Sequence, residues 1–111
     1  MKTNILTTSL VTVLSLTASL VLAAEPKELW EKHCASCHGK DGKGQTKMGA
    51  KLSIKDLSDP KNQESFKDED AAKAIKEGIK DKDAKIRMKA VEGLSADDIA
   101  GLVKYVRTLK K

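Results

Sequence analysis

The stretch Cys34-Ala35-Ser36-Cys37-His38 is the most informative part of this chain of 111 residues, because it places two thiols and an imidazole in one short turn. On a helical turn, residues three apart share a face, so both thiols can add across the two vinyl groups on one edge of a haem. His38 would then lie under the ring and offer a nitrogen to the iron. CxxCH is the attachment pattern of a c-type haem, and it predicts one covalently bound haem c.

Two other roles for the cysteines are open. A thioredoxin-like redox pair needs a βαβ setting, and no segment of this sequence alternates convincingly as a strand. A closed zinc site needs four ligands, and Cys34, Cys37 and His38 lie so close together that a second cluster would have to complete it. Only His33 remains as a further Cys or His ligand, so the haem interpretation is favoured.

The N-terminal segment predicts export. Lys2 precedes an uncharged stretch, 5–22, and two alanines then precede Glu25. This order is typical of a cleaved secretory signal, which we assign to residues 1–24. An uncleaved membrane anchor is the alternative, but seven Ser and Thr residues interrupt a stretch that should hold about 20 apolar residues. We therefore expect a periplasmic or otherwise exported protein, residues 25–111, with no stable membrane insertion.

The charge of the mature chain is positive and unevenly placed. The whole sequence has 21 Lys and Arg against 16 Asp and Glu, and losing Lys2 leaves 20 against 16, a formal charge of +4. Within 38–55 five lysines oppose Asp41 alone: Lys40, Lys43, Lys47, Lys51 and Lys55. This basic collar suggests docking on redox partners with acidic surfaces, with ordinary solubility as the alternative. Nucleic acid is disfavoured, because the segment lacks aromatic residues and the chain is predicted to be exported.

Helical periodicity dominates the mature chain. Pro26 can start a first helix that leads into Cys34, and the acidic turn at 68–70 starts a middle helix that ends near Gly78. The last helix begins after Ser95, with Asp98 three residues on, and carries an apolar stripe to Leu109. Between the first two, a glycine-rich loop at 39–49 shows no periodicity. We predict one small all-α domain, which needs a buried haem to complete its core.

The mature chain resembles the small bacterial class I, monohaem c-type cytochromes over nearly all of 25–111. The matching features are an aromatic residue four before the first cysteine (Trp30), CASCHG, GKDGKG, a lone Met before the last helix (Met88) and LSADDIAGLVKYVRTL. The resemblance implies three to four helices around one haem. It also implies a tight crossing of the first and last helices, which places Trp30 against Leu102 and Tyr105.

Two positions depart from the family pattern. Members often have a glycine early in the first helix where this chain has Pro26, so Gly101 is expected to permit the close approach instead. Many members also have a proline twelve residues after the ligand histidine, whose carbonyl accepts the imidazole N–H and tunes the iron. Ala50 stands there, and its carbonyl can fill the role on a less rigid backbone. Leu52 is then expected to pack on the haem edge.

The sixth iron ligand has four candidates: Met88, Met48, His33 and a lysine. Met88 is preferred, because the fifty residues after His38 are enough chain to reach the opposite face of the haem, and its neighbours Arg87 and Lys89 are too polar for a core segment. A gap-filling core role is the alternative for Met88. Met48 lies only ten residues after His38, and His33 is tied to the same face of the ring as His38.

Ligation by both His38 and Met88 would saturate the iron and leave outer-sphere electron transfer as its chemistry. The sequence thus predicts a non-enzymatic carrier of single electrons through Fe(III)/Fe(II) exchange, in which the thioether raises the potential. If Met88 does not ligate, an open iron could bind a small gas or turn over peroxide. A fixed cytochrome subunit of a larger oxidoreductase is a further alternative.

Overall fold

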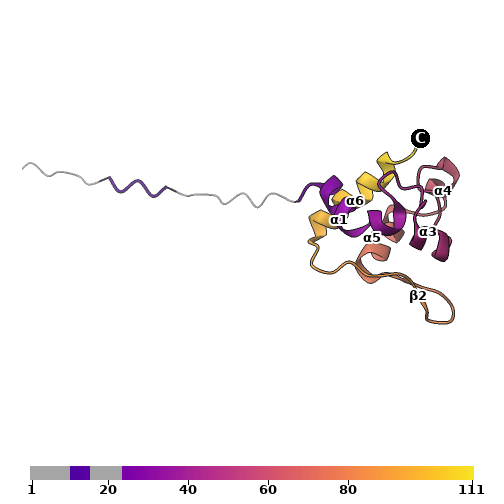
Figure 1. Cartoon of the computed structure of the whole chain (residues 1–111). Coiled ribbons are helices and arrows are strands. Elements are labelled where there is room, and N and C mark those ends of the chain that lie inside the picture. The colour runs from indigo at the N-terminus through magenta and orange to yellow at the C-terminus, as the bar shows by residue number, and fades with distance from the viewer. Residues whose placement is uncertain (1–10, 16–23) are drawn as a thin grey trace, which may run out of the picture.

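The structure is a computed structural model that describes residues 11–15 and 24–111 (Figure 1). The helices are α1 (Pro26–His33), α2 (Ala35–His38), α3 (Lys47–Leu52), α4 (Pro60–Glu64), α5 (Asp68–Glu77) and α6 (Ala96–Thr108), and the strands are β1 (Ile79–Lys80) and β2 (Ile86–Met88). The helices carry the fold, so the prediction of a small all-α domain is confirmed.

The crossing of α1 and α6 forms the centre of the domain. Pro26 occupies the first turn of α1, where its missing N–H costs no hydrogen bond. Gly101 of α6 lies against it, and a Cβ at Gly101 would stand 3.2 Å from Cγ of Pro26. The rings of Trp30 and Tyr105 pack with centroids 5.7 Å apart. The expected close approach is therefore found, with the glycine on the last helix instead of the first.

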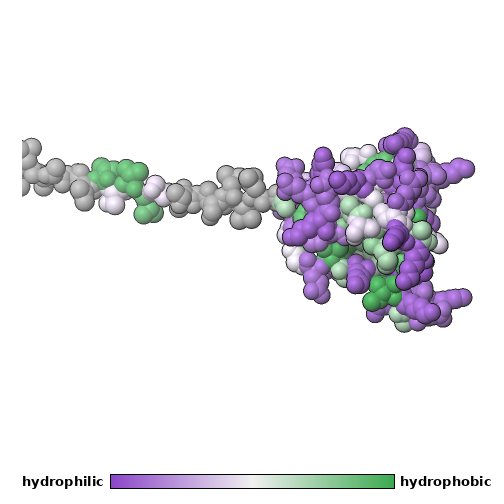
Figure 2. Space-filling view, viewed as in Figure 1, coloured by the Kyte–Doolittle hydropathy of each residue, from purple (hydrophilic) through white to green (hydrophobic). Residues whose placement is uncertain are grey.

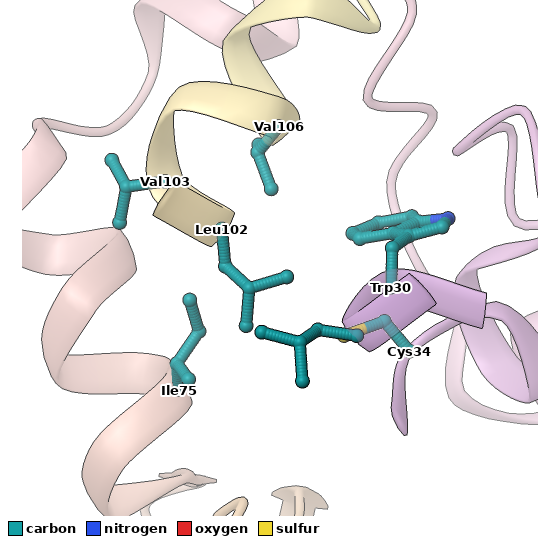
Figure 3. Close-up of a cluster of buried hydrophobic side chains, with 7 residues drawn as sticks. Trp30, Cys34, Ile75, Leu102, Val103 and Val106 are labelled. Atoms are coloured by element: carbon teal, nitrogen blue, oxygen red, sulfur yellow. The ribbon is translucent and has the colours of Figure 1, made fainter. Parts of the chain in front are cut away.

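The apolar core lies where α1, α5 and α6 meet. Leu102 is fully buried and stands between Trp30 and Ile75 (Figure 3). The cluster joins one face of each helix, as the 3.6-residue periodicity requires, and consists of Leu29, Trp30, Cys34, Ile75, Leu102, Val103 and Val106. A cysteine of the CxxCH stretch is thus itself a core residue.

Helix termini follow the caps expected from the sequence. Oγ of Ser95 accepts the N–H of Asp98 at 3.0 Å, and the carboxylate of Asp98 accepts the N–H of Ser95 at 3.1 Å. This capping box fixes the start of α6. The middle helix α5 spans Asp68–Glu77 and ends at Gly78, as predicted.

Three parts of the fold differ from the sequence expectation. The glycine-rich loop contains the short helix α3, and α4 follows it where we expected no element. A two-stranded antiparallel hairpin pairs Ile79 with Met88 and Lys80 with Ile86, with an irregular register between the two pairs. The expectation of no strand is thus wrong at this point, because strands of two and three residues are too short to show alternation.

The predicted leader, residues 1–24, lies outside the described residues except for 11–15 and Ala24. Nothing in the structure tests its cleavage. In the parts of the chain that are described, no helix is both long and apolar enough to cross a bilayer.

Candidate haem site

Both cysteines of the motif lie on one continuous helical path. The N–H of Cys34 donates to the carbonyl of Trp30 at 2.9 Å, which ends α1, and the N–H of His38 donates back to the carbonyl of Cys34 at 2.9 Å, which closes α2. Both thiols are free of disulfide bonds. Cys34 is buried and Cys37 is half-buried, and burial raises the pKa of the Cys34 thiol to about 11. The two thiols are thus available, three residues apart, on one turn.

Two adjoining cavities of about 360 and 380 Å³ open beside this turn. Their volumes lie within the range usual for ligand and cofactor sites. The two cavities share residues from the CxxCH turn, the loop after α3 and the hairpin. These shared residues are Cys34, His38, Lys55, Leu57, Ile79 and Met88. An apolar hollow with a thiol and an imidazole on one wall fits a flat apolar macrocycle.

His38 has a half-buried imidazole that is suited to bind a metal ion. Its Nδ1 is buried and has no hydrogen-bond partner among the described residues. Burial lowers the pKa of its imidazole, which favours the neutral form that binds metal. The ring of Trp30 lies 5.5 Å from it, and the indole N–H of Trp30 donates to the carbonyl of Gly39 at 3.0 Å. Packing against Trp30 therefore places the imidazole ring of His38, while its Nδ1 makes no hydrogen bond within the described residues.

The predicted hydrogen bond between His38 and the carbonyl of Ala50 is not found in the structure. The carbonyl of Ala50 accepts the N–H of Ser53 at 3.3 Å instead. Ala50 belongs to α3, and its carbonyl serves the last turn of that helix. Ala50 lines neither cavity, whereas Leu52 lines the second one.

Met88 lines both cavities, lies on β2 and is half-buried. Met48 lines neither cavity and is 42% exposed, and His33 lines only the second. The backbone of Met88 is held close to Gly78, where a Cβ would stand 2.5 Å from the carbonyl oxygen of Met88. The structure thus brings Met88, Cys34 and His38 to one site and leaves Met48 outside it.

Sequence reasoning did not identify several residues of the cavity walls. Phe66, the sole phenylalanine, lines the first cavity, and Arg87 lines the second. Leu57 and Ile79 line both. Phe66 could have been singled out as the one aromatic residue outside the helix crossing, whereas no local pattern marks Ile79.

The zinc alternative finds no support in the described residues, where no group of three or more His, Cys, Asp or Glu side chains is placed to hold a metal ion. The lone imidazole of the CxxCH turn and the apolar cavities are instead suited to an iron that brings four ligands of its own.

Comparison with known proteins agrees with this site. The family model for cytochrome c matches residues 23–110. Cytochrome c-554(547) of Halothiobacillus neapolitanus is 33% identical over 88 residues, which cover 79% of this chain and 97% of that protein. Among solved structures, the KustC0563 c-type cytochrome is 30% identical with a TM-score of 0.67, covering 79% of this chain and all of that one. The chain therefore belongs to the cytochrome c family of monohaem electron-transfer proteins, which bind covalently attached haem c, and its Cys34 and Cys37 stand in the CxxCH arrangement consistent with that attachment.

Proposed function

We propose that this protein is an exported carrier of single electrons in which His38 and Met88 are the two axial ligands of the haem iron. The observation that supports this most strongly is the common lining of the two cavities, where Met88 shares both linings with Cys34 and His38. Met48, the other methionine considered as the sixth ligand, is exposed and lies outside both cavities.

Each residue has a separate part in this function. Cys34 and Cys37 fix the cofactor to the CxxCH turn, and the half-buried imidazole of His38 offers the fifth ligand. The thioether of Met88 would fill the remaining ligand position of the iron and keep substrates away from the metal. The haem supplies a reversible one-electron change between Fe(III) and Fe(II), whose potential the axial ligands set. With both positions filled, we expect no catalysis at the iron.

The optical spectrum of the ferric protein tests the ligand assignment. We expect a low-spin spectrum with the sulfur-to-iron charge-transfer band in the wild type. Met88→Ala should abolish the band and open the iron to added ligands, whereas Met48→Ala, which removes an exposed thioether of the same kind, should leave the spectrum unchanged. The reverse result would assign the sixth ligand to Met48. A high-spin wild-type spectrum would overturn the carrier proposal in favour of a gas-binding or peroxidase-like site.

We further propose that the basic collar docks acidic redox partners. Of its five lysines, Lys43 is half-buried and the other four are exposed: Lys40, Lys47, Lys51 and Lys55. Within the described residues the ion pairs are Lys73–Glu77 and Arg107–Asp68, so no collar lysine forms a close ion pair there, although the charge of Lys43 acts on the carboxylate of Asp56. Unpaired surface cations speed the encounter with an anionic partner more than they deepen its affinity.

Oxidation of the ferrous protein by hexacyanoferrate(III) tests the collar with an anionic probe. The rate should fall as salt is raised, and Lys47→Glu should slow the reaction at low salt. Lys104→Glu, an equal charge change on the exposed face of α6, is the control and should slow it less. Equal effects of the two variants would contradict docking at the collar. A stable, salt-resistant complex on size exclusion of native extracts would favour a fixed subunit.

Export rests on the sequence of residues 1–24. We propose that the leader is removed and that the haem is attached outside the cytoplasmic membrane. Intact-mass measurement of the haem protein from the periplasmic fraction should give a chain that begins at Ala24 or Glu25. A mass that includes Met1 would refute cleavage.

A further inference from the structure

The hairpin that carries Met88 has few attachments to the rest of the domain. Its strands contact mainly each other, whereas the helices pack on one another, and Figure 1 shows the hairpin reaching away from them. At its base the N–H of Val91 donates to the carbonyl of Ile75 at 2.9 Å. Ile79 and Ile86 are exposed, and Figure 2 shows apolar side chains breaking the hydrophilic surface on this side. Core burial therefore does little to hold the hairpin in place.

One side chain ties strand β2 of the hairpin to the end of α3. Nη2 of Arg87 donates to the carbonyl of Leu52, which is the last residue of α3 and lies 35 residues away in the sequence. Arg87 and Leu52 line the second cavity together with His38. The bond thus spans the site, from the segment after the CxxCH turn to the strand that carries Met88.

The chemistry of both partners favours this bond. A carbonyl in the last turn of a helix has no donor within the helix, so it needs one from elsewhere. The guanidinium is a charged donor, and charge-assisted hydrogen bonds are stronger than neutral ones. In the described chain Arg87 takes part in no ion pair, so its guanidinium is not held by a carboxylate there.

We propose that Arg87 is a positioning residue that clasps the hairpin to the end of α3 and so holds Met88 in place as the sixth ligand. This inference rests on the proposed ligation by Met88. Arg87 precedes Met88 directly in β2, so fixing its side chain fixes the strand one residue from the thioether. Loss of the clasp raises the fraction of molecules in which the hairpin has swung away and the iron is open.

Competition by added imidazole measures that open fraction in the ferric holoprotein, because the apparent affinity of a competitor scales with the population that can bind it. Arg87→Gln removes the guanidinium while keeping a polar side chain, and should tighten apparent imidazole binding about tenfold, equivalent to ~1.4 kcal/mol. Lys85→Gln is the matched control. It removes one positive charge from the same hairpin, at an exposed residue that lines neither cavity, and should leave the affinity within about twofold, well below that tenfold step.

Amide hydrogen exchange in 79–88 provides a second readout that does not depend on the iron, because it reports local opening of the hairpin. Exchange should be faster in Arg87→Gln than in the wild type or Lys85→Gln, with the amides of α6 unchanged. If Arg87→Gln and Lys85→Gln have the same exchange rates and the same imidazole affinity, the proposed role of Arg87 is wrong. If the wild type lacks the sulfur-to-iron band, the ligation proposal fails, and exchange alone decides whether Arg87 holds the hairpin.

Discussion

Replacing Gly78 by alanine should loosen the site at the base of the hairpin. Gly78 follows α5 with φ 76° and ψ −176°, a region that is nearly restricted to glycine and costs other residues about 1–3 kcal/mol. The added Cβ would also stand 2.5 Å from the carbonyl oxygen of Met88 and 2.8 Å from the amide nitrogen of Ala90. Both neighbours are backbone, so relief requires the Met88 strand to move.

Gly93 provides the matched control, since it has φ 79° but nothing within 4 Å of an added Cβ. Gly93→Ala should cost only the conformational term, about 1–2 kcal/mol of unfolding free energy. Gly78→Ala should cost about 3 kcal/mol or more, because the collision adds to the conformational term. It should also weaken the sulfur-to-iron band, which Gly93→Ala should not.

Urea unfolding of the ferric holoprotein, followed by the fluorescence of Trp30, the sole tryptophan, gives both free energies. The near-infrared spectrum gives the state of the sixth ligand. Equal destabilisation by the two substitutions, with the band intact in both, would refute the inference that Gly78 sets the position of Met88.

Two further substitutions test the helical part of the fold. Gln63 is buried and its amide donates to the carbonyls of Leu57 and Val106. Gln63→Ala should therefore cost about 1–3 kcal/mol in urea unfolding, because it removes the bond to Leu57 and leaves the carbonyl of Val106 with the N–H of Leu109 alone. A loss under about 0.5 kcal/mol, as at an ordinary surface position, would contradict this. Hydrogen bonds from the side chain and N–H of Ser58 lower the pKa of Asp56. A carboxyl whose pKa is lower in the folded than in the unfolded protein stabilises the fold at pH values above its unfolded-state pKa, and this stability is lost as the pH falls through its folded-state pKa. Ser58→Ala should therefore raise the pKa of Asp56 in an NMR titration and reduce the loss of stability on acidification, and an unchanged titration would show that the side-chain bond is not its cause.

The sequence predicted the long helices because their signals are local. The capping box at Ser95 and the stripe through Leu102 mark α6 without reference to the rest of the chain, and the acidic first turn does the same for α5. Helix α3 has six residues and the strands of the hairpin have two and three. Elements that short depend on contacts with distant residues, so their own sequence carries little periodicity.

The residues of the site also differ in whether a local sequence pattern identifies them. CxxCH is a local pattern, and it identified Cys34, Cys37 and His38 directly. Met88 could be inferred from chain length and from its polar neighbours, although nothing local shows that it lies on a strand. The bond between Arg87 and Leu52 joins residues 35 apart, and no spacing rule predicts it. The bond expected between His38 and Ala50 is not found in the structure, where Ala50 lies in α3, a helix that the sequence did not reveal, and its carbonyl accepts the N–H of Ser53.

The burial of Cys34 in the helix crossing links attachment of the haem to closure of the domain. Only 6% of this residue is exposed, and it packs with Trp30 and Leu102 at the junction of the first and last helices. In the closed domain Cys34 borders only the two cavities that the haem itself would fill. We therefore expect the thioether bond at Cys34 to form before α1 and α6 close on each other.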